Sequence, residues 1–197
     1  MLAGVPPLVE EPITPATSCL CYLSLSEWHL GEIASCQATK AEVIALAKEL
    51  NDMQALVQAL YYAAVLGQFE HNPAKVERLA SDLLELSTRQ NFSTWLPAGA
   101  VLRGCARSTS GDTAEGIAWI EKGITDHRAS GAMLMVPFFL ALKAEALHLA
   151  DRTSEALEVI NEAEARVERF EEHWWCAELH RLRSVFLATI GAEETAN

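Results

Sequence analysis

Three potential metal ligands lie close together near the end of the sequence. His173, Cys176 and His180 are three and four residues apart, so on a helix they share one face. Two imidazoles and a thiolate can bind zinc or a similar metal, and Glu172 is a candidate fourth ligand. Two tryptophans lie within the same segment, and packing of an edge helix is the explanation that we favour. We therefore predict neither a bound metal nor a cofactor.

The five cysteines offer little further chemistry. Cys19 and Cys21 are the closest pair, but residues two apart on a helix point about 200° away from each other. Cys105 and His148 could meet across a groove, although nucleophilic catalysis would also need an orienting third group and an oxyanion hole. We predict a protein that is not an enzyme and has no catalytic residue, and a metalloenzyme remains the distant alternative.

Composition and charge narrow the classes of partner. Half of the 197 residues are apolar, and the formal net charge is -12. Such a field repels nucleic-acid phosphates and anionic lipid surfaces, so we expect neither to bind. The longest apolar run, residues 132–142, is too short to span a bilayer. An odd number of cysteines and a start without signal-peptide character favour reduced thiols in a cytoplasmic protein.

Small residues recur at a fixed 40-residue spacing along the chain. The first small-residue column contains Ser24, Ala64, Gly104, Ala144 and Ser184. The second small-residue column, 12 residues later, contains Cys36, Val76, Gly116 and Ala156. A third column follows seven residues further on, with Val43, Leu83, Gly123 and Ala163. A fixed period predicts stacked copies of one supersecondary unit, with short side chains where neighbouring helices cross.

Turn-forming residues divide the chain into helices between these columns. We predict helices over residues 16–30, 33–50, 53–69, 74–90, 93–109, 114–129, 132–150, 154–170 and 173–190. Odd-numbered helices are called A helices and even-numbered ones B helices. The expected fold is an all-α solenoid of about four helix pairs, closed by the ninth helix as a C-terminal cap. Residues 1–15 hold four prolines and should be an irregular lead-in or linker to a domain over 16–197.

This arrangement of small residues resembles the tetratricopeptide repeat (TPR). That motif has a shorter period, of roughly 34 residues, and the longer unit here is similar to the TPR-like helical region of MalT-type regulators. The resemblance implies that A helices line a concave surface where peptides or other ligands bind. Eight residues are then the candidates for this groove: Gln58, Tyr61, Phe69, Arg103, Glu145, His148, Glu178 and Arg181.

A second resemblance covers most of the chain from about residue 17. The segments 45–50, Leu102-Arg103-Gly104 with Gly116-Ile117, and above all 177–183 resemble the C-terminal part of certain bacterial signalling proteins. In those proteins a nucleotide cyclase or DNA-binding domain precedes an AAA-type ATPase, and a long TPR-like array follows. This chain lacks the phosphate-loop motif G-x-x-x-x-G-K-[ST], so the resemblance implies a regulatory part and not the catalytic one.

Two classes of function follow from these patterns. The first is a non-catalytic TPR-like module that binds a protein, a peptide or a small molecule and regulates a cyclase/ATPase-type signalling protein. Binding in the groove would be coupled to small rotations between repeats. The alternative is a structural self-assembly unit, because the N-terminal repeat has no obvious polar cap and a homodimer could cover its apolar end.

Overall fold

The computed structural model describes residues 15–196, which contain nine α-helices, two short 3₁₀ turns and no β-strand. The helices are α1 (Pro15–His29), α2 (Ile33–Glu49), α3 (Met53–Phe69), α4 (Pro73–Gln90), α5 (Leu96–Thr109), α6 (Thr113–Ala129), α7 (Val136–Leu149), α8 (Thr153–Phe170) and α9 (Cys176–Ala196). The 3₁₀ turns η1 (Ser93–Trp95) and η2 (His173–Trp175) precede α5 and α9. The all-α prediction is confirmed, and the predicted lead-in lies outside the described residues except for Pro15.

The seventh helix is the one whose start was predicted least well. It begins at Val136 instead of residue 132, because Gly131 and Met135 both have positive φ angles, of 83° and 69°. Left-handed residues cannot continue a right-handed helix. Pro137 lies in the first turn of α7, where its missing N–H breaks no helical hydrogen bond. The ninth helix is longer than predicted and continues to Ala196.

One left-handed residue ends nearly every helix, and these residues are evenly spaced along the chain. They are Gly31, Asn51, His71, Asn91, Gly111, Gly131, Asp151 and Glu171. Beside them the N–H of Asp112 donates to Arg107 O at 3.0 Å, and the N–H of Arg152 donates to Leu147 O at 2.9 Å. These are the six-to-one bonds that satisfy the last carbonyls of a helix. A helix and its turn therefore take half of the repeat seen in the sequence, and a helix pair takes all of it.

The described helices belong to two compact units, residues 1–59 and 60–197. In the first unit α1 packs on α2. Ser24 of α1 and Cys36 of α2, which are members of the first two columns, are both buried. The side chain of Ser18 donates to Oε1 of Gln58 at 3.0 Å, which joins α1 to the beginning of α3.

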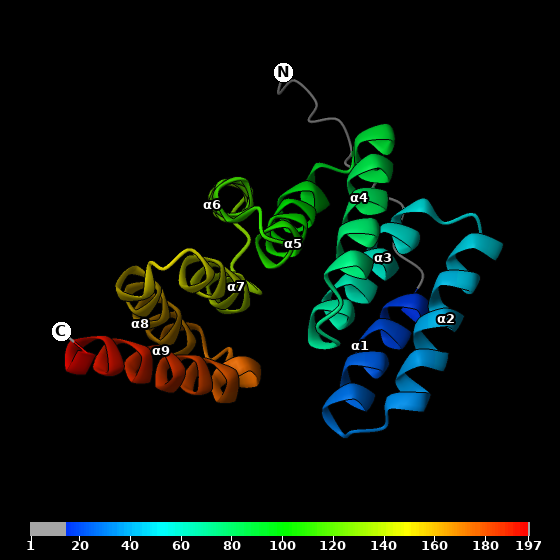
Figure 1. Cartoon of the computed structure of the whole chain (residues 1–197). Helices are drawn as coiled ribbons and strands as arrows, with labels where there is room; N and C mark the ends of the chain where they lie inside the picture. The colour runs from blue at the N-terminus through cyan, green and yellow to red at the C-terminus, as the bar shows by residue number, and fades with distance from the viewer. Residues whose placement is uncertain (1–14, 197) are drawn as a thin grey trace, which may run out of the picture. The chain divides into compact units, whose positions relative to one another are not determined.

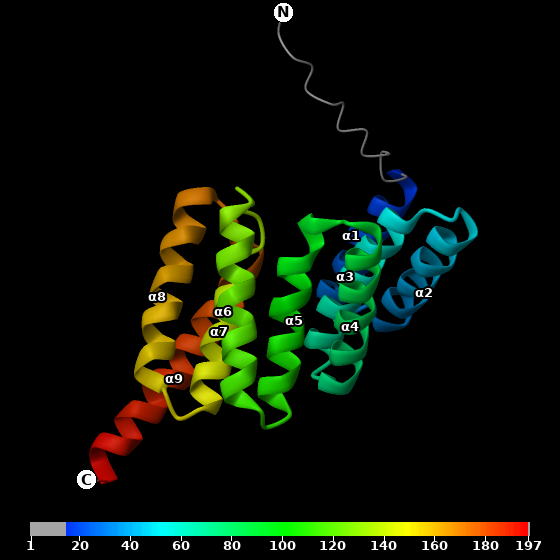
Figure 2. The ribbon, with the colours of Figure 1, turned by 90° about the horizontal axis from the view of Figure 1, so that it is seen from above.

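In the second unit each helix from α4 to α9 packs on the next one along the chain. The A helices also contact one another, α5 with α7 and α7 with α9. Figure 1 shows α5, α7 and α9 as one row, with α6 and α8 on one side of it. In Figure 2 the successive helices α5 to α8 run alternately up and down. This solenoid-like stacking leaves one side of the row of A helices without B helices.

Glycines bring α5 and α6 into backbone contact. A Cβ atom on Gly104 would lie 2.5 Å from the carbonyl oxygen of Gly116, and one on Gly116 would lie 2.5 Å from the carbonyl oxygen of Gly104. A Cβ atom on Gly123 would lie 2.7 Å from the carbonyl oxygen of Pro97. Real Cβ atoms do not approach other atoms so closely, so only glycine fits at these positions. The small residues of the three columns are thus the contact points between A and B helices.

The last member of the first column lies in a different environment. Ala64, Gly104 and Ala144 are buried, whereas Ser184 of α9 is exposed. No B helix follows α9 within the described residues. Ser184 is therefore exposed because no described B helix covers this face of α9.

Two glycines in helix interiors provide a matched test of this packing. Gly116→Ala should lower the free energy of unfolding by about 1–3 kcal/mol, because the new methyl group overlaps α5. Gly191→Ala in α9 meets nothing within 4 Å and should raise it by up to about 1 kcal/mol, since alanine favours helix. Urea unfolding followed by circular dichroism measures both, and equal effects of the two substitutions would contradict the close contact.

Candidate ligand-binding pocket

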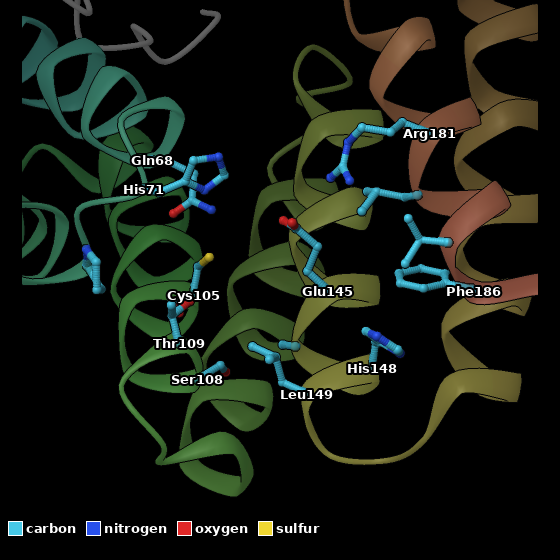
Figure 3. A pocket seen from close by; sticks show the side chains of 14 residues that line it. Gln68, His71, Cys105, Ser108, Thr109, Glu145, His148, Leu149, Arg181 and Phe186 are labelled. Atoms are coloured by element: carbon cyan, nitrogen blue, oxygen red, sulfur yellow. The ribbon is translucent and has the colours of Figure 1, made fainter. Parts of the chain in front are cut away.

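A cavity of about 280 Å³ opens between the A helices of the second unit (Figure 3). The end of α3, the start of α4, and the helices α5, α7 and α9 supply its walls. Its lining residues are Gln68, His71, Pro73, Cys105, Ser108, Thr109, Glu145, Ala146, His148, Leu149, Arg181, Leu182, Val185 and Phe186. An apolar surface with a few polar groups is typical of a site for a small ligand.

The 40-residue register explains which residues meet in this cavity. Cys105, Glu145 and Val185 are equivalent positions of three successive A helices, and all three line it. Gln68, Ser108 and His148 form a second set with the same spacing. Stacked repeats place equivalent residues next to one another. Extending the columns of Glu145 and His148 to the neighbouring helices would have found Gln68, Ser108 and Val185, which the sequence prediction missed.

Glu145 is a half-buried carboxyl group in the wall of the pocket. Burial, and to a smaller extent the negative charge of Glu178, raise its pKa from 4.5 to about 7, although the positive charge of Arg181 acts in the opposite direction. No hydrogen bond or ion pair joins its carboxylate to another described residue. Glu145 therefore exchanges a proton near neutral pH and has no permanent partner of opposite charge.

Arg181 already has a carboxylate partner on its own helix. Its Nε donates to Oε2 of Glu178 at 2.7 Å, and its Nη2 donates to Oε1 at 2.5 Å. Figure 3 shows the Arg181 side chain extending from α9 toward the side of the pocket where Glu145 lies. Together Glu145, Glu178 and Arg181 carry one more negative charge than positive charge once Glu145 is ionised.

Cys105 and His148 line the same pocket but lack the chemistry of a nucleophilic pair. Burial raises the pKa of the Cys105 thiol well above its usual range, and the nearby charge of Glu145 adds to the effect. A protonated thiol is a poor nucleophile. The Nδ1 atom of His148 lies 3.0 Å from Oγ1 of Thr153, and its ring lies 4.8 Å from that of Phe186. These contacts favour a role for both residues in shaping the pocket.

Four of the eight predicted groove residues lie at this pocket. Glu145, His148 and Arg181 line it, and Glu178 pairs with Arg181 at its edge. Phe69 does not line this pocket. Its ring stacks on that of Trp175, with 4.9 Å between the ring centres, and makes an edge contact with Phe138. An aromatic cluster thus joins the end of α3 to α7 and η2.

The other three predicted residues are used in packing. Tyr61 is 4% exposed, and its ring lies 5.5 Å from that of Trp95. Gln58, in the first unit, is 7% exposed and accepts the hydrogen bond from Ser18. Arg103 faces the B helices, because it directly precedes Gly104, the residue that contacts α6. Its Nε donates to Oε1 of Glu77 in α4 at 3.1 Å, and its guanidinium lies 5.0 Å from the centre of the Trp119 ring in α6.

The potential metal ligands near η2 have other contacts. Cys176 Sγ lies 3.6 Å from Nδ1 of His173, while Nδ1 of His180 lies 3.5 Å from a carboxylate oxygen of Glu164. The carboxylate of Glu172 accepts a hydrogen bond from the backbone N–H of Met135 at 2.8 Å, and a second one from the indole N–H of Trp174. Among residues 15–196 no three His, Cys, Asp or Glu side chains gather closely enough to hold a metal ion.

Comparison with known proteins gives a partial likeness. No protein-family model matches the chain. It is 26% identical over 174 residues to an uncharacterised protein of Rhizobium meliloti (strain 1021), in an alignment that covers 88% of this chain and 17% of that protein. The chain therefore spans a small part of the length of this relative, and the likeness extends into both compact units. Within the described residues no helix has the length and apolar character needed to cross a bilayer.

The titration of Glu145 gives a testable dependence of stability on pH. Its pKa is higher in the folded chain, so the folded state holds a proton that the unfolded state releases between pH 4.5 and about 7. This carboxyl group should therefore lower the free energy of unfolding as the pH rises through that interval, by up to about 3 kcal/mol.

The variant Glu145→Gln isolates this effect, because glutamine mimics the protonated acid at every pH. Urea unfolding of both proteins at pH 5 and pH 8 measures it. We expect the variant to gain stability relative to the wild-type protein between pH 5 and pH 8. A stability difference between the two proteins that does not change with pH would show that Glu145 titrates normally.

Proposed function

We propose that this chain is a non-catalytic, TPR-like binding module that senses a small molecule or a peptide side chain in the pocket between α3, α5, α7 and α9. The observation that carries the proposal is the unpaired Glu145 carboxyl group in a pocket with apolar walls. We further propose that the module acts in the cytoplasm as the regulatory region of a cyclase/ATPase-type signalling protein. All five cysteines are free, which suits a reducing compartment.

The size and lining of the pocket favour a compact ligand. Its volume of about 280 Å³ is near the lower end for ligand sites, so a small molecule or one side chain fits better than a long peptide. Leu149, Leu182 and Phe186 offer apolar contact, and Gln68 offers a hydrogen-bonding amide. A ligand with both an apolar and a polar part would use all of these.

The position of the pocket suggests how binding could be transmitted. A ligand there would contact the A helices of successive repeats, and those helices also pack on one another. A ligand that fits one inter-helix arrangement better than another shifts the population toward it by its difference in affinity. Small rotations between repeats are the motion that this coupling would use.

Two leucines of nearly equal exposure allow a direct test of the pocket. Leu149, at its mouth, is 52% exposed, and Leu187, on α9 and outside the lining, is 53% exposed. In a ligand-observed NMR screen of amino acids, amines, nucleotides and organic acids, at least one compound should bind the wild-type protein. Leu149→Trp should weaken that binding at least tenfold by filling the pocket, and Leu187→Trp should not. The proposal fails if no compound binds, or if the affinity of every compound that binds is unchanged by Leu149→Trp.

A second candidate function is self-assembly through α9. His180, Ser184, Leu187, Ala188 and Gly191 lie on one face of this helix, and all are exposed. In α7 the equivalents of His180, Ser184 and Leu187, which are Leu140, Ala144 and Leu147, are buried. A second copy of the chain could cover this face of α9. The self-assembly alternative would then use this face as its interface.

Sedimentation velocity over a concentration range tests the self-assembly candidate. If α9 is the interface, the wild-type protein should form a dimer, and Leu187→Glu should raise its dissociation constant at least tenfold by placing a charge in the contact. Leu149→Glu adds the same charge at a similarly exposed site and should leave the dimer intact. A wild-type protein that stays monomeric at every concentration rules this candidate out.

A further inference from the structure

We propose that the ligand of this pocket carries a cationic group, an ammonium or a guanidinium, which pairs with the Glu145 carboxylate. This inference rests on the proposed function, because it identifies the chemical class of ligand that the same pocket would take.

Negative charge exceeds positive charge around Arg181 once Glu145 is ionised. Glu178 occupies the guanidinium of Arg181 through two hydrogen bonds, at 2.7 and 2.5 Å. Glu145 has no such partner, although it lies in the same wall (Figure 3). A half-buried carboxylate that must share its nearest cation, Arg181, with a second carboxylate is costly, and an incoming cation lowers that cost.

Arg181 is the cation whose charge acts on Glu145, and it is already held by Glu178. The residues facing the pocket are Cys105 from α5, Gln68 and His71 from the end of α3 and its turn, His148 from α7, and Arg181 from α9. A buried thiol and an amide carry no positive charge. Arg181, which already has its own carboxylate partner, is the one arginine or lysine among the lining residues.

The pocket also offers an apolar surface to the alkyl part of a cation. Leu182 and Phe186 of α9 and Leu149 of α7 are apolar residues that line the same pocket as Glu145. An alkyl chain that ends in an ammonium or guanidinium would place its methylenes on these residues and its charge at Glu145, as lysine and arginine side chains do at such surfaces. The net charge of -12 also raises the local concentration of cations.

The proton on Glu145 gives this pairing a distinct signature. At pH 6 most Glu145 side chains are protonated, since the pKa is about 7, and a cation must displace that proton in order to bind. At pH 8 the carboxylate is already formed. The affinity for a cation should therefore rise about tenfold between pH 6 and pH 8, and an uncharged ligand should show no such rise.

Four probes with the same butyl chain separate charge from shape: n-butylammonium, n-butylguanidinium, 1-butanol and butyrate. Two-dimensional ¹H–¹⁵N NMR titrations of the full chain report both the affinity and the residues that move. We expect the two cations to shift the pocket residues and to bind at least tenfold more tightly than the alcohol and the acid. Their affinity should be higher at pH 8 than at pH 6.

Two variants that each remove one negative charge complete the test. Glu145→Gln should lower the affinity of the protein for the two cations at least tenfold. Glu158→Gln, at an exposed position of α8, should leave that affinity unchanged. Equal losses in both variants would reveal attraction to the net charge alone and would overturn the pairing.

The remaining outcomes separate this inference from the proposed function. If butanol or butyrate fills the pocket as well as the cations, the inference fails, while the pocket remains a ligand site. If no probe shifts a pocket residue, the inference fails, and the ligand screen with Leu149→Trp decides separately whether the pocket binds other compounds.

Discussion

Helices α5 and α6 touch through their backbones, and the stacking of the second unit depends on contacts of this kind. Gly104 and Gly116 lie so close that neither position has room for a Cβ atom. Side chains of any larger size would push the axes apart and shift every residue that α5 presents to α7. Ala144 and Ala156 occupy the equivalent positions of α7 and α8 and are fully buried. Small side chains therefore also set the distance between the axes of α7 and α8.

The period that places the small residues on the B-helix side also places the pocket residues on the other side. Glu145 and Cys105 are adjacent because they are equivalent positions of neighbouring A helices. The left-handed residues that close each turn keep this register constant from one helix to the next. The register of the repeats therefore decides which side chains meet in the pocket. The pKa of Glu145 is raised because stacking places this residue in a partly buried position.

The sequence was sufficient for the helices and their turns, because glycine, asparagine and aspartate mark most of the ends and buried small residues mark the crossings. It was insufficient to predict which side chains face the pocket. Arg103 is one residue before a column glycine, and so its side chain points to the B helices. Tyr61 and Phe69 were expected to be available to a ligand, but they join aromatic contacts with residues distant in sequence, Trp95 and Trp175. Such contacts depend on the three-dimensional path of the chain, which periodicity alone does not give.

The backbone contact between α5 and α6 can be observed directly in solution. A nuclear Overhauser experiment on protein labelled at glycine reports whether the α-protons of Gly104 and Gly116 are neighbours. The close packing of this helix pair predicts a strong cross-peak between them, and another from the α-protons of Gly123 to the protons of Val101. If both cross-peaks are missing in the folded protein, the two helices are not packed in the register described, and the pocket that depends on that register is lost with it.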